Sequence, residues 1–263
     1  MREISLEELK KLQMDVLEAI DIFCRDNDIR YSIACGTLLG AVRHKGYIPW
    51  DDDIDIYMLR SEYDKLISKF PLLYKEKYKL LSLERSNKWD LVYAKAFNDE
   101  TIVIEAATVG ETYGVNIDIY PIDNVPDDDK EWKRYNKWRR KIQLLHAYQF
   151  RTYDSMNSWI KKFLLFLVQP FSRLTARFID SFVCRYNNEA TKYVFESSQG
   201  LLVKNRFERN LFDHLIEMKF EDRTFMAFAD FDNYLSNAYG DYMKLPPKEK
   251  RVTHHTFKAF WKV

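Results

Sequence analysis

The chain contains little of several residue types, and each shortage excludes a class of protein. It has only 7 glycines and 3 cysteines among its 263 residues. The cysteines, Cys24, Cys35 and Cys184, have no metal-binding or disulfide spacing, so we expect a reducing, cytoplasmic compartment. The longest apolar run, residues 163–168, is far shorter than the roughly 20 residues that a membrane-spanning helix needs.

Net charge is also nearly absent from the chain as a whole. Lys and Arg number 41 and Asp and Glu number 40, which gives a net charge of +1, so we expect no nucleic-acid partner. The N-terminal residues 1–13 are too charged for a signal peptide. Hydrophobic residues make up 46% of the chain, which excludes a disordered or collagen-like protein and suits one large domain or a core with an added subdomain.

Helical and alternating apolar patterns predict an α+β protein, in which a mixed sheet is flanked by helices. A helix begins at the capping box of Ser5 and Glu8 and ends near residue 26. Further helices are expected at 38–43, 61–70 and 231–239, and strands at 29–34, 53–58, 79–83, 92–97, 101–105 and 115–120.

A change of composition after Pro126 predicts the domain organisation. We expect a catalytic core over residues 1–126, a helical subdomain over 127–200, and a C-terminal segment over 201–263 that packs back on the core. The middle part is rich in aromatic and basic residues.

Paired acids give the strongest chemical signal. Asp53 and Asp55 are two residues apart on a predicted strand, so both side chains face one side with Cα atoms roughly 6.5 Å apart. Asp118 has the same setting in the later segment VNIDIYPID and joins them if the two strands are neighbours. Such carboxylates repel one another, and a divalent cation, Mg²⁺ or Mn²⁺, relieves that repulsion. The alternative is a set of solvated acids on the open face of a sheet.

Residues just upstream of these acids suit phosphate binding. Gly36 and Thr37 lie between a strand and a short helix, where free backbone N–H groups and a hydroxyl can bind phosphate. Arg43, His44 and Lys45 follow as a compact cationic cluster. Any one of these three is more simply a charged surface residue, but together with the acids they indicate a site.

Weaker candidates lie elsewhere in the chain. Lys95 on a predicted strand reaches a phosphate group or is an ordinary surface or ion-pair lysine. Arg251, His254 and His255 form a basic tail that either closes over the site or is solvated. Trp50, with Tyr47, can stack on a planar ring or contact an ammonium group, although loop aromatics more often only pack.

The segment from Gly36 to Ile56, GTLLGAVRHKGYIPWDDDIDI, resembles the signature of the LicD family of phosphotransferases, which includes the fukutin-like proteins. VNIDIYPID and YGDYMKLPPKEKRVTHH are also similar to family segments. The resemblance implies a nucleotidyltransferase fold, with Gly36 and Thr37 in the phosphate-binding turn. It also implies that Asp53, Asp55 and Asp118 are the catalytic, metal-binding acids.

What the resemblance implies for function is transfer of a phospho-alcohol, often phosphocholine, from a CDP-linked donor such as CDP-choline. The acceptor would be a cell-surface glycan, such as lipopolysaccharide or teichoic acid, or its lipid-linked precursor, and CMP would be released. One alternative is a nucleotidyltransferase that moves an NMP onto a small molecule. Another is a non-catalytic binding module of the same fold.

Residues 159–186 allow two interpretations. Phe171, Leu174, Phe178 and Phe182 form an apolar stripe at helical spacing, beside several Arg and Lys residues. Such a helix packs against the protein core, which is the more common outcome, or lies on the inner face of a membrane as a peripheral contact.

Overall fold

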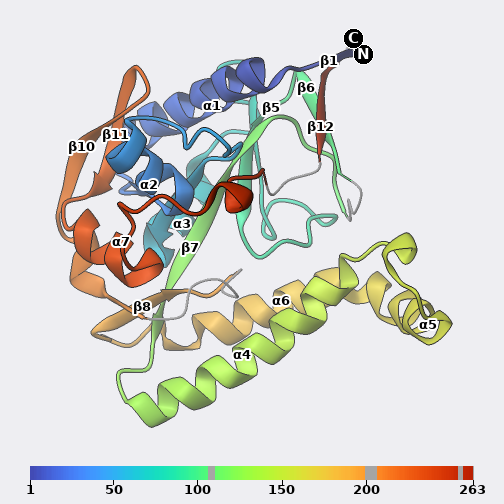
Figure 1. Cartoon of the computed structure of the whole chain (residues 1–263). Helices are drawn as coiled ribbons and strands as arrows, with labels where there is room; N and C mark the ends of the chain where they lie inside the picture. The colour runs from blue at the N-terminus through green and yellow to red at the C-terminus, as the bar shows by residue number, and fades with distance from the viewer. Residues whose placement is uncertain (106–109, 199–205, 254–256, 263) are drawn as a thin grey trace.

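The structure is a computed structural model that describes residues 1–105, 110–198, 206–253 and 257–262. Within these residues a seven-stranded mixed sheet is flanked by helices, as predicted for an α+β chain (Figure 1). Its main path runs β2-β3-β7-β5-β4, and β8 and β9 extend from β7. The strands are β2 (Ser32–Ile33), β3 (Asp55–Leu59), β4 (Tyr78–Leu81), β5 (Ala94–Asn98), β7 (Asn116–Val125), β8 (Tyr193–Glu196) and β9 (Phe207–Glu208).

Strand β7 lies at the centre of the sheet and is longer than the sequence predicts. The expected end at residue 120 is wrong, because the strand continues through Pro121 to Val125. Antiparallel pairing with β5 reaches Ile119, and pairing with β8 begins at Ile122. Pro121 lies between these two partners, so on that side its missing N–H breaks no ladder hydrogen bond.

Helices on the sheet have buried apolar faces. Helix α1 (Leu6–Asp26) is capped as predicted by Ser5, whose Oγ accepts the Glu8 backbone N–H at 3.3 Å. It packs on β5 and β7, and α3 (Arg60–Lys69) packs on β3 and β7. The ring of Phe23 in α1 also contacts that of Phe70 at the end of α3, at 5.0 Å, so the two helices pack together on the sheet.

Helix α2 (Cys35–His44) begins earlier than predicted and includes Gly36 and Thr37 in its first turn. Cys35 has a φ of 48°, a left-handed conformation that turns strand β2 directly into the helix. Helix α7 (Phe231–Tyr239) packs against α2 and β11, and ends as predicted at Gly240, with a φ of 71°.

Two smaller sheets complete the core. β1 (Arg2–Glu3), β12 (Lys258–Trp261) and β6 (Thr101–Ile104) form one, so the two ends of the chain lie side by side (Figure 1). β10 (Leu215–Phe220) and β11 (Arg223–Phe228) form an antiparallel hairpin. The C-terminal strand therefore contacts the core, while the division at residues 126 and 200 stays a prediction.

The helices between β7 and β8 form a separate layer, here called the helical arm (residues 129–186). Helices α4 and α6 pack together, with the rings of Tyr135 and Phe182 stacked at 5.3 Å, and α5 projects beyond their end (Figure 1). Its elements are α4 (Asp129–Gln149), η1 (Tyr153–Ser155), α5 (Trp159–Val168), η2 (Gln169–Phe171), α6 (Ser172–Val183) and η3 (Cys184–Tyr186).

The apolar stripe of the arm does not face the protein core. Phe171, Leu174 and Phe178 are 57%, 66% and 58% exposed, and only Phe182 is half-buried. The core-facing interpretation is therefore wrong for the first three, because α6 turns Ala176, Ile179 and Val183 inward instead. Among the described residues, no helix combines the length and apolar character needed to cross a bilayer.

Candidate active site

Parallel pairing of β3 with β7 brings two of the predicted acids together. Asp55 and Asp118 are direct partners in the register, which confirms that the two acid-bearing strands are neighbours. Asp53 lies two residues before Asp55, but β3 begins only at Asp55. Strand alternation therefore does not place Asp53, although its charge acts on the Asp55 carboxylate.

The Asp55 carboxylate is in an electrostatically costly position. Asp55 is only 8% exposed, and its Oδ1 has no hydrogen-bond partner among the described residues. Burial raises the pKa of the Asp55 carboxyl well above its ordinary value, and the charges of Asp53 and Asp118 raise it further. The position itself is fixed from the backbone, because the Asp55 N–H donates to Thr37 Oγ1 at 2.9 Å.

Asp118 is surrounded by hydrogen-bond donors. Lys95 Nζ lies 2.6 Å from Oδ1, Asn116 Nδ2 donates to the same oxygen at 2.7 Å, and the Tyr120 hydroxyl donates to Oδ2 at 3.2 Å. Lys95 thus forms an ion pair with a predicted site acid, and its contact with a donor phosphate stays a prediction. Asn116 and Tyr120 were not predicted to have a role, and their signal was the strand alternation that puts them on the face of Asp118.

Lys95 is itself held in place by aromatic rings. Its ammonium lies 5.0 Å from the ring centroid of Tyr113 and 5.6 Å from that of Tyr93. The residue is 7% exposed, so its charge is poorly screened by water. This cation therefore stabilises the negative charge of Asp118 strongly.

The start of α2 lies against a further acid. A Cβ atom on Gly36 would lie 2.4 Å from Asp51 Oδ2, so only glycine fits there without displacing that carboxylate. The positive end of the helix dipole favours such an anion. Thr37 is buried and its hydroxyl accepts the Asp55 N–H, so it positions an acid. Phosphate binding by Gly36 and Thr37 stays a prediction.

The cationic cluster at the C-terminal end of α2 contacts the C-terminal tail. Arg43 Nη1 donates to the Tyr242 carbonyl oxygen at 2.7 Å, and its Nε donates to His44 Nε2 at 3.0 Å. Burial lowers the pKa of His44, and the Arg43 charge lowers it further. Lys45 is exposed, with Nζ 3.3 Å from the Val42 carbonyl oxygen.

Trp50 lies where the C-terminal tail meets the loop that follows α2. The Arg251 guanidinium lies 5.6 Å from the Trp50 ring centroid, the His44 ring approaches edge-on at 6.1 Å, and Thr253 Oγ1 donates to the Trp50 carbonyl oxygen at 3.2 Å. The structure thus brings Arg251 to the loop. His254 and His255 lie outside the described residues, so their roles stay predictions.

Oxygen-rich chemistry at the acids fits a hard divalent cation such as Mg²⁺ or Mn²⁺. The unpartnered, buried Oδ1 of Asp55 is the observation that supports this fit, because burial of an unpaired carboxylate oxygen costs free energy. Among the described residues, however, no group of three or more His, Cys, Asp or Glu side chains has a geometry that could hold a metal ion. The three-carboxylate metal site stays a prediction.

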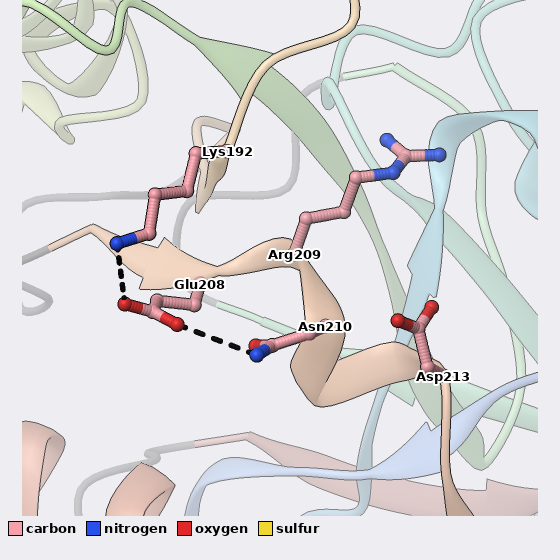
Figure 2. A pocket seen from close by; sticks show the side chains of 5 residues that line it. All are labelled: Lys192, Glu208, Arg209, Asn210 and Asp213. Carbon is pink, nitrogen blue, oxygen red and sulfur yellow. Dashed lines mark hydrogen bonds and ion pairs between the residues drawn. The ribbon is translucent and has the colours of Figure 1, made fainter.

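A shallow cavity of about 270 Å³ lies elsewhere, beside β9. Figure 2 shows it, with a Lys192–Glu208 ion pair of 2.9 Å at its rim. Its lining contains none of the predicted site residues, and consists of Lys192, Glu208, Arg209, Asn210 and Asp213. We assign it no part in the chemistry.

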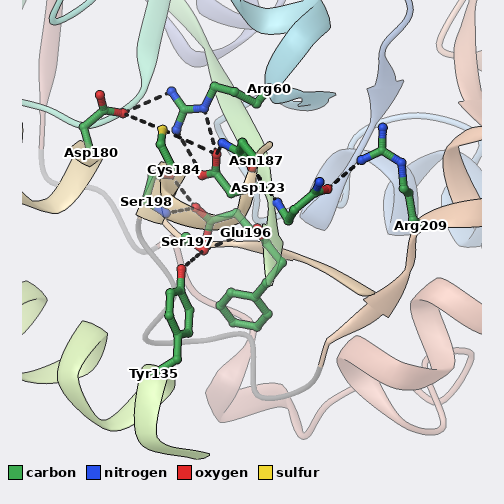
Figure 3. A network of polar contacts seen from close by, with 12 residues as sticks. Arg60, Asp123, Tyr135, Asp180, Cys184, Asn187, Glu196, Ser197, Ser198 and Arg209 are labelled. Atoms are coloured by element: carbon green, nitrogen blue, oxygen red, sulfur yellow. Dashed lines mark hydrogen bonds and ion pairs between the residues drawn. The ribbon is translucent and has the colours of Figure 1, made fainter. Parts of the chain in front are cut away.

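A buried polar network attaches the arm to the far end of β7 (Figure 3). Arg60 of α3 pairs with Asp123 of β7 at 2.8 Å and with Asp180 of α6 at 3.0 Å. Asn187 Nδ2 donates to Asp123 Oδ1 at 2.7 Å. Because Asp123 is fully buried and Asp118 lies five residues away on the same strand, this network anchors the arm to the strand that carries the site.

Comparison with known proteins points to one family. A family model described as LicD/FKTN/FKRP, nucleotidyltransferase domain, matches residues 28–160. The chain is 30% identical to the lipopolysaccharide cholinephosphotransferase LicD of Haemophilus influenzae, over 99% of each chain. It is also 30% identical to an uncharacterized protein of Rickettsia typhi, over 41% of this chain and 42% of that one. The acids and the cationic cluster at the end of α2 lie within the residues that the family model matches, and the C-terminal tail lies beyond them.

Proposed function

The chain belongs to the LicD family, and from this premise we propose that it transfers phosphocholine from CDP-choline to a cell-surface glycan or its lipid-linked precursor. CMP is the other product. The similarity to a cholinephosphotransferase supports the transferase class. The proposal places the protein in the cytoplasm, in keeping with its free cysteines.

The observation that carries the proposal is the pairing of Asp55 with Asp118 across parallel strands. One carboxylate is buried with an unpartnered oxygen, and the other is held by Lys95. A solvated set of surface acids would show neither feature. A binding module without chemistry would gain nothing from holding these charges together against their repulsion.

In this proposal the acceptor hydroxyl attacks the phosphorus of the phosphocholine group and loses its proton to solvent, and the bond from that phosphorus to the CMP oxygen breaks. Asp53, Asp55 and Asp118 would hold Mg²⁺, which supplies positive charge for the attacking and leaving oxygens. Lys95 holds Asp118 in position and adds a buried positive charge beside it. The backbone bond from Asp55 to Thr37 keeps that carboxylate oriented.

Donor binding is assigned to the loop and tail. Arg43 offers a planar fork that suits two phosphate oxygens. Trp50 presents an aromatic face that now contacts Arg251, so a donor base or a choline ammonium would have to share or displace that contact. Closure of the tail over the donor would then expel water from the phosphates.

A panel of donors tests the proposal. The protein is incubated with CDP-choline, CDP-ethanolamine, CDP-glycerol and CDP-ribitol, and in parallel with nucleoside triphosphates, in the presence of a glycan acceptor. We expect CMP from CDP-choline and no pyrophosphate from the triphosphates. Release of pyrophosphate would favour the nucleotidyltransferase alternative, and absence of both products would favour the binding module.

A further inference from the structure

The charge of the molecule is strongly segregated, although the whole chain is nearly neutral. The helical arm, residues 129–186, contains thirteen Lys and Arg and only four acids. The rest of the chain holds twenty-eight basic and thirty-six acidic residues. The helical arm is therefore a cationic element on an acidic body, and it will be drawn to anionic surfaces.

Helix α5 of the arm is apolar on nearly all of its faces and yet is exposed. Trp159 is 77% exposed, Phe163 55% and Phe166 63%, and Leu165 is the buried residue of this helix. A helix that is apolar all round is normally buried in a protein or in lipid. Here α5 projects beyond α4 and α6 rather than packing into the core (Figure 1).

The exposed apolar surface continues through η2 onto α6. Phe171, Leu174 and Phe178 follow one another at spacings of three and four residues, which puts them on one helix face. Exposed Lys161 and Lys162 lie within α5 itself. Apolar side chains flanked by cations are typical of helices that lie in a membrane interface.

We propose that α5 and the outward face of α6 dock on an anionic lipid surface without crossing it. The apolar side chains would gain nothing from a nucleic acid or another hydrophilic polyanion. The cations oppose contact between two copies of the arm, because such a contact would bring like charges together. This inference rests on the proposed function, because docking on a membrane would bring the enzyme to a lipid-linked acceptor.

Vesicle flotation tests the docking without any catalytic readout. The full chain is mixed with phosphatidylcholine vesicles that contain about 30 mol% phosphatidylglycerol, or with neutral phosphatidylcholine vesicles. We expect flotation with the anionic vesicles only. Equal flotation with both, or flotation with neither, would overturn the proposal.

Variants separate the two parts of the surface. Replacing both lysines, Lys161→Gln with Lys162→Gln, should lower the vesicle partition coefficient about 25-fold, at about fivefold per charge. The triple variant Phe166→Ser, Leu174→Ser, Phe178→Ser should lower it at least tenfold. Leu72→Ser is the matched control, because Leu72 is 85% exposed but lies outside the arm, and its partition should equal that of the wild type.

Other outcomes are decisive as well. Unchanged flotation of both arm variants would overturn the proposal, as would sedimentation showing that the wild type self-associates through this face and the triple variant does not. CMP release from CDP-choline in vesicle-free solution keeps the two proposals apart. Flotation without CMP release would overturn the proposed function alone, and CMP release without flotation would overturn the docking alone.

Discussion

The sheet and the helical arm both place side chains where they cost free energy, but in opposite ways. At the sheet, the Asp55 carboxylate is buried beside other acids. On the arm, Phe166 and Leu174 are large apolar side chains exposed to water. Neither arrangement helps an isolated chain to fold, so each is better explained by what the region contacts in function.

The two regions also differ in how firmly the buried acids of the sheet and the exposed apolar side chains of the arm are held in place. Asp118 is surrounded by donors from β5 and β7, and Asp55 is tied to Thr37, so the acids are held rigidly before any ligand arrives. The apolar side chains of α5 have only Leu165 as a buried anchor. Chemistry demands fixed geometry, whereas contact with a fluid surface does not.

The largest effect is expected at Asp55. Asp55→Asn keeps the shape of the side chain but removes the charge, so CMP release from CDP-choline should fall about a thousandfold or more. The free energy of unfolding should not fall, because a buried carboxylate among acids is replaced by a neutral group. Asp26→Asn, on an exposed acid at the end of α1, is the control. A fully active Asp55→Asn protein would remove the acids from the mechanism.

The Lys95–Asp118 pair gives the next largest effect, on stability. The two side chains are 9% and 14% exposed, so Lys95→Met leaves a nearly buried carboxylate without its cation. We expect the free energy of unfolding in urea to fall by about 3 kcal/mol, and the added change Asp118→Asn to restore part of it.

A matched control for this pair lies on the surface. Lys65 pairs with Glu62 at 2.7 Å, but its side chain is 48% exposed, so Lys65→Met should cost less than about 1 kcal/mol. If Lys95→Met proves as mild as Lys65→Met, the buried pair does not hold the site together. The contrast between a rigid site and a loosely supported arm would then be lost.

A change at Arg43 tests whether the cationic cluster at the end of α2 binds the donor. Loss of a charge-assisted phosphate contact is worth about 1.5–3 kcal/mol, so Arg43→Ala should lower kcat/KM for CDP-choline roughly ten- to a hundredfold. Arg43→Lys should recover only part, since a point charge does not replace the fork. The variant also loses the bond to the Tyr242 carbonyl, so some loss of stability is expected.

The control for Arg43 comes from the other region. Arg140 is exposed on the arm, and Arg140→Ala should leave kcat/KM for the soluble donor unchanged. Wild-type kinetics for Arg43→Ala would make the cationic loop an ordinary solvated surface.

The smallest effect concerns how α4 is attached to the core. His146 is 8% exposed with Nε2 2.9 Å from the Asp90 carbonyl oxygen, and burial lowers its pKa to about 4. Its ordinary value is about 6.5, so the unfolded chain binds the proton more readily below that pH. Stability from this group is full above pH 6.5 and is lost as the pH falls toward 4.

For His146 the expected loss of unfolding free energy between pH 7 and pH 5 is about 2 kcal/mol. His146→Gln should flatten that part of the stability curve measured by urea unfolding. His214→Gln should not, because His214 is exposed. A stability curve unchanged by His146→Gln would mean that protonation of this histidine does not weaken the packing of α4 on the core.

Much of the fold was readable from local patterns. The cap at Ser5, the helix at α7 and the alternating strand segments follow from periodicity and turn residues, which act over a few residues. The length of β7 could not be predicted from such patterns. The strand continues past Pro121 only because β5 pairs before that residue and β8 pairs after it. Likewise the early start of α2 depends on the left-handed Cys35.

The site was predicted in part. The alternation of acidic and apolar residues correctly indicated that Asp55 and Asp118 lie on the same face of the sheet. It could do so because side chains alternate between the two faces of any strand, whatever its neighbours. The pairing of Lys95 with Asp118 could not be derived, since Lys95 reaches it only through the β5–β7 register. The direction of Phe171 stayed open between two interpretations, because a helical stripe does not reveal on which side the core lies.

Dependence of CMP release on a divalent cation tests the central claim most directly. The protein is freed of metal with EDTA, and turnover of CDP-choline with a glycan acceptor is followed as Mg²⁺ is added back. The account predicts no release in EDTA and recovery with Mg²⁺, with no recovery in Asp55→Asn. Full turnover in EDTA would contradict it.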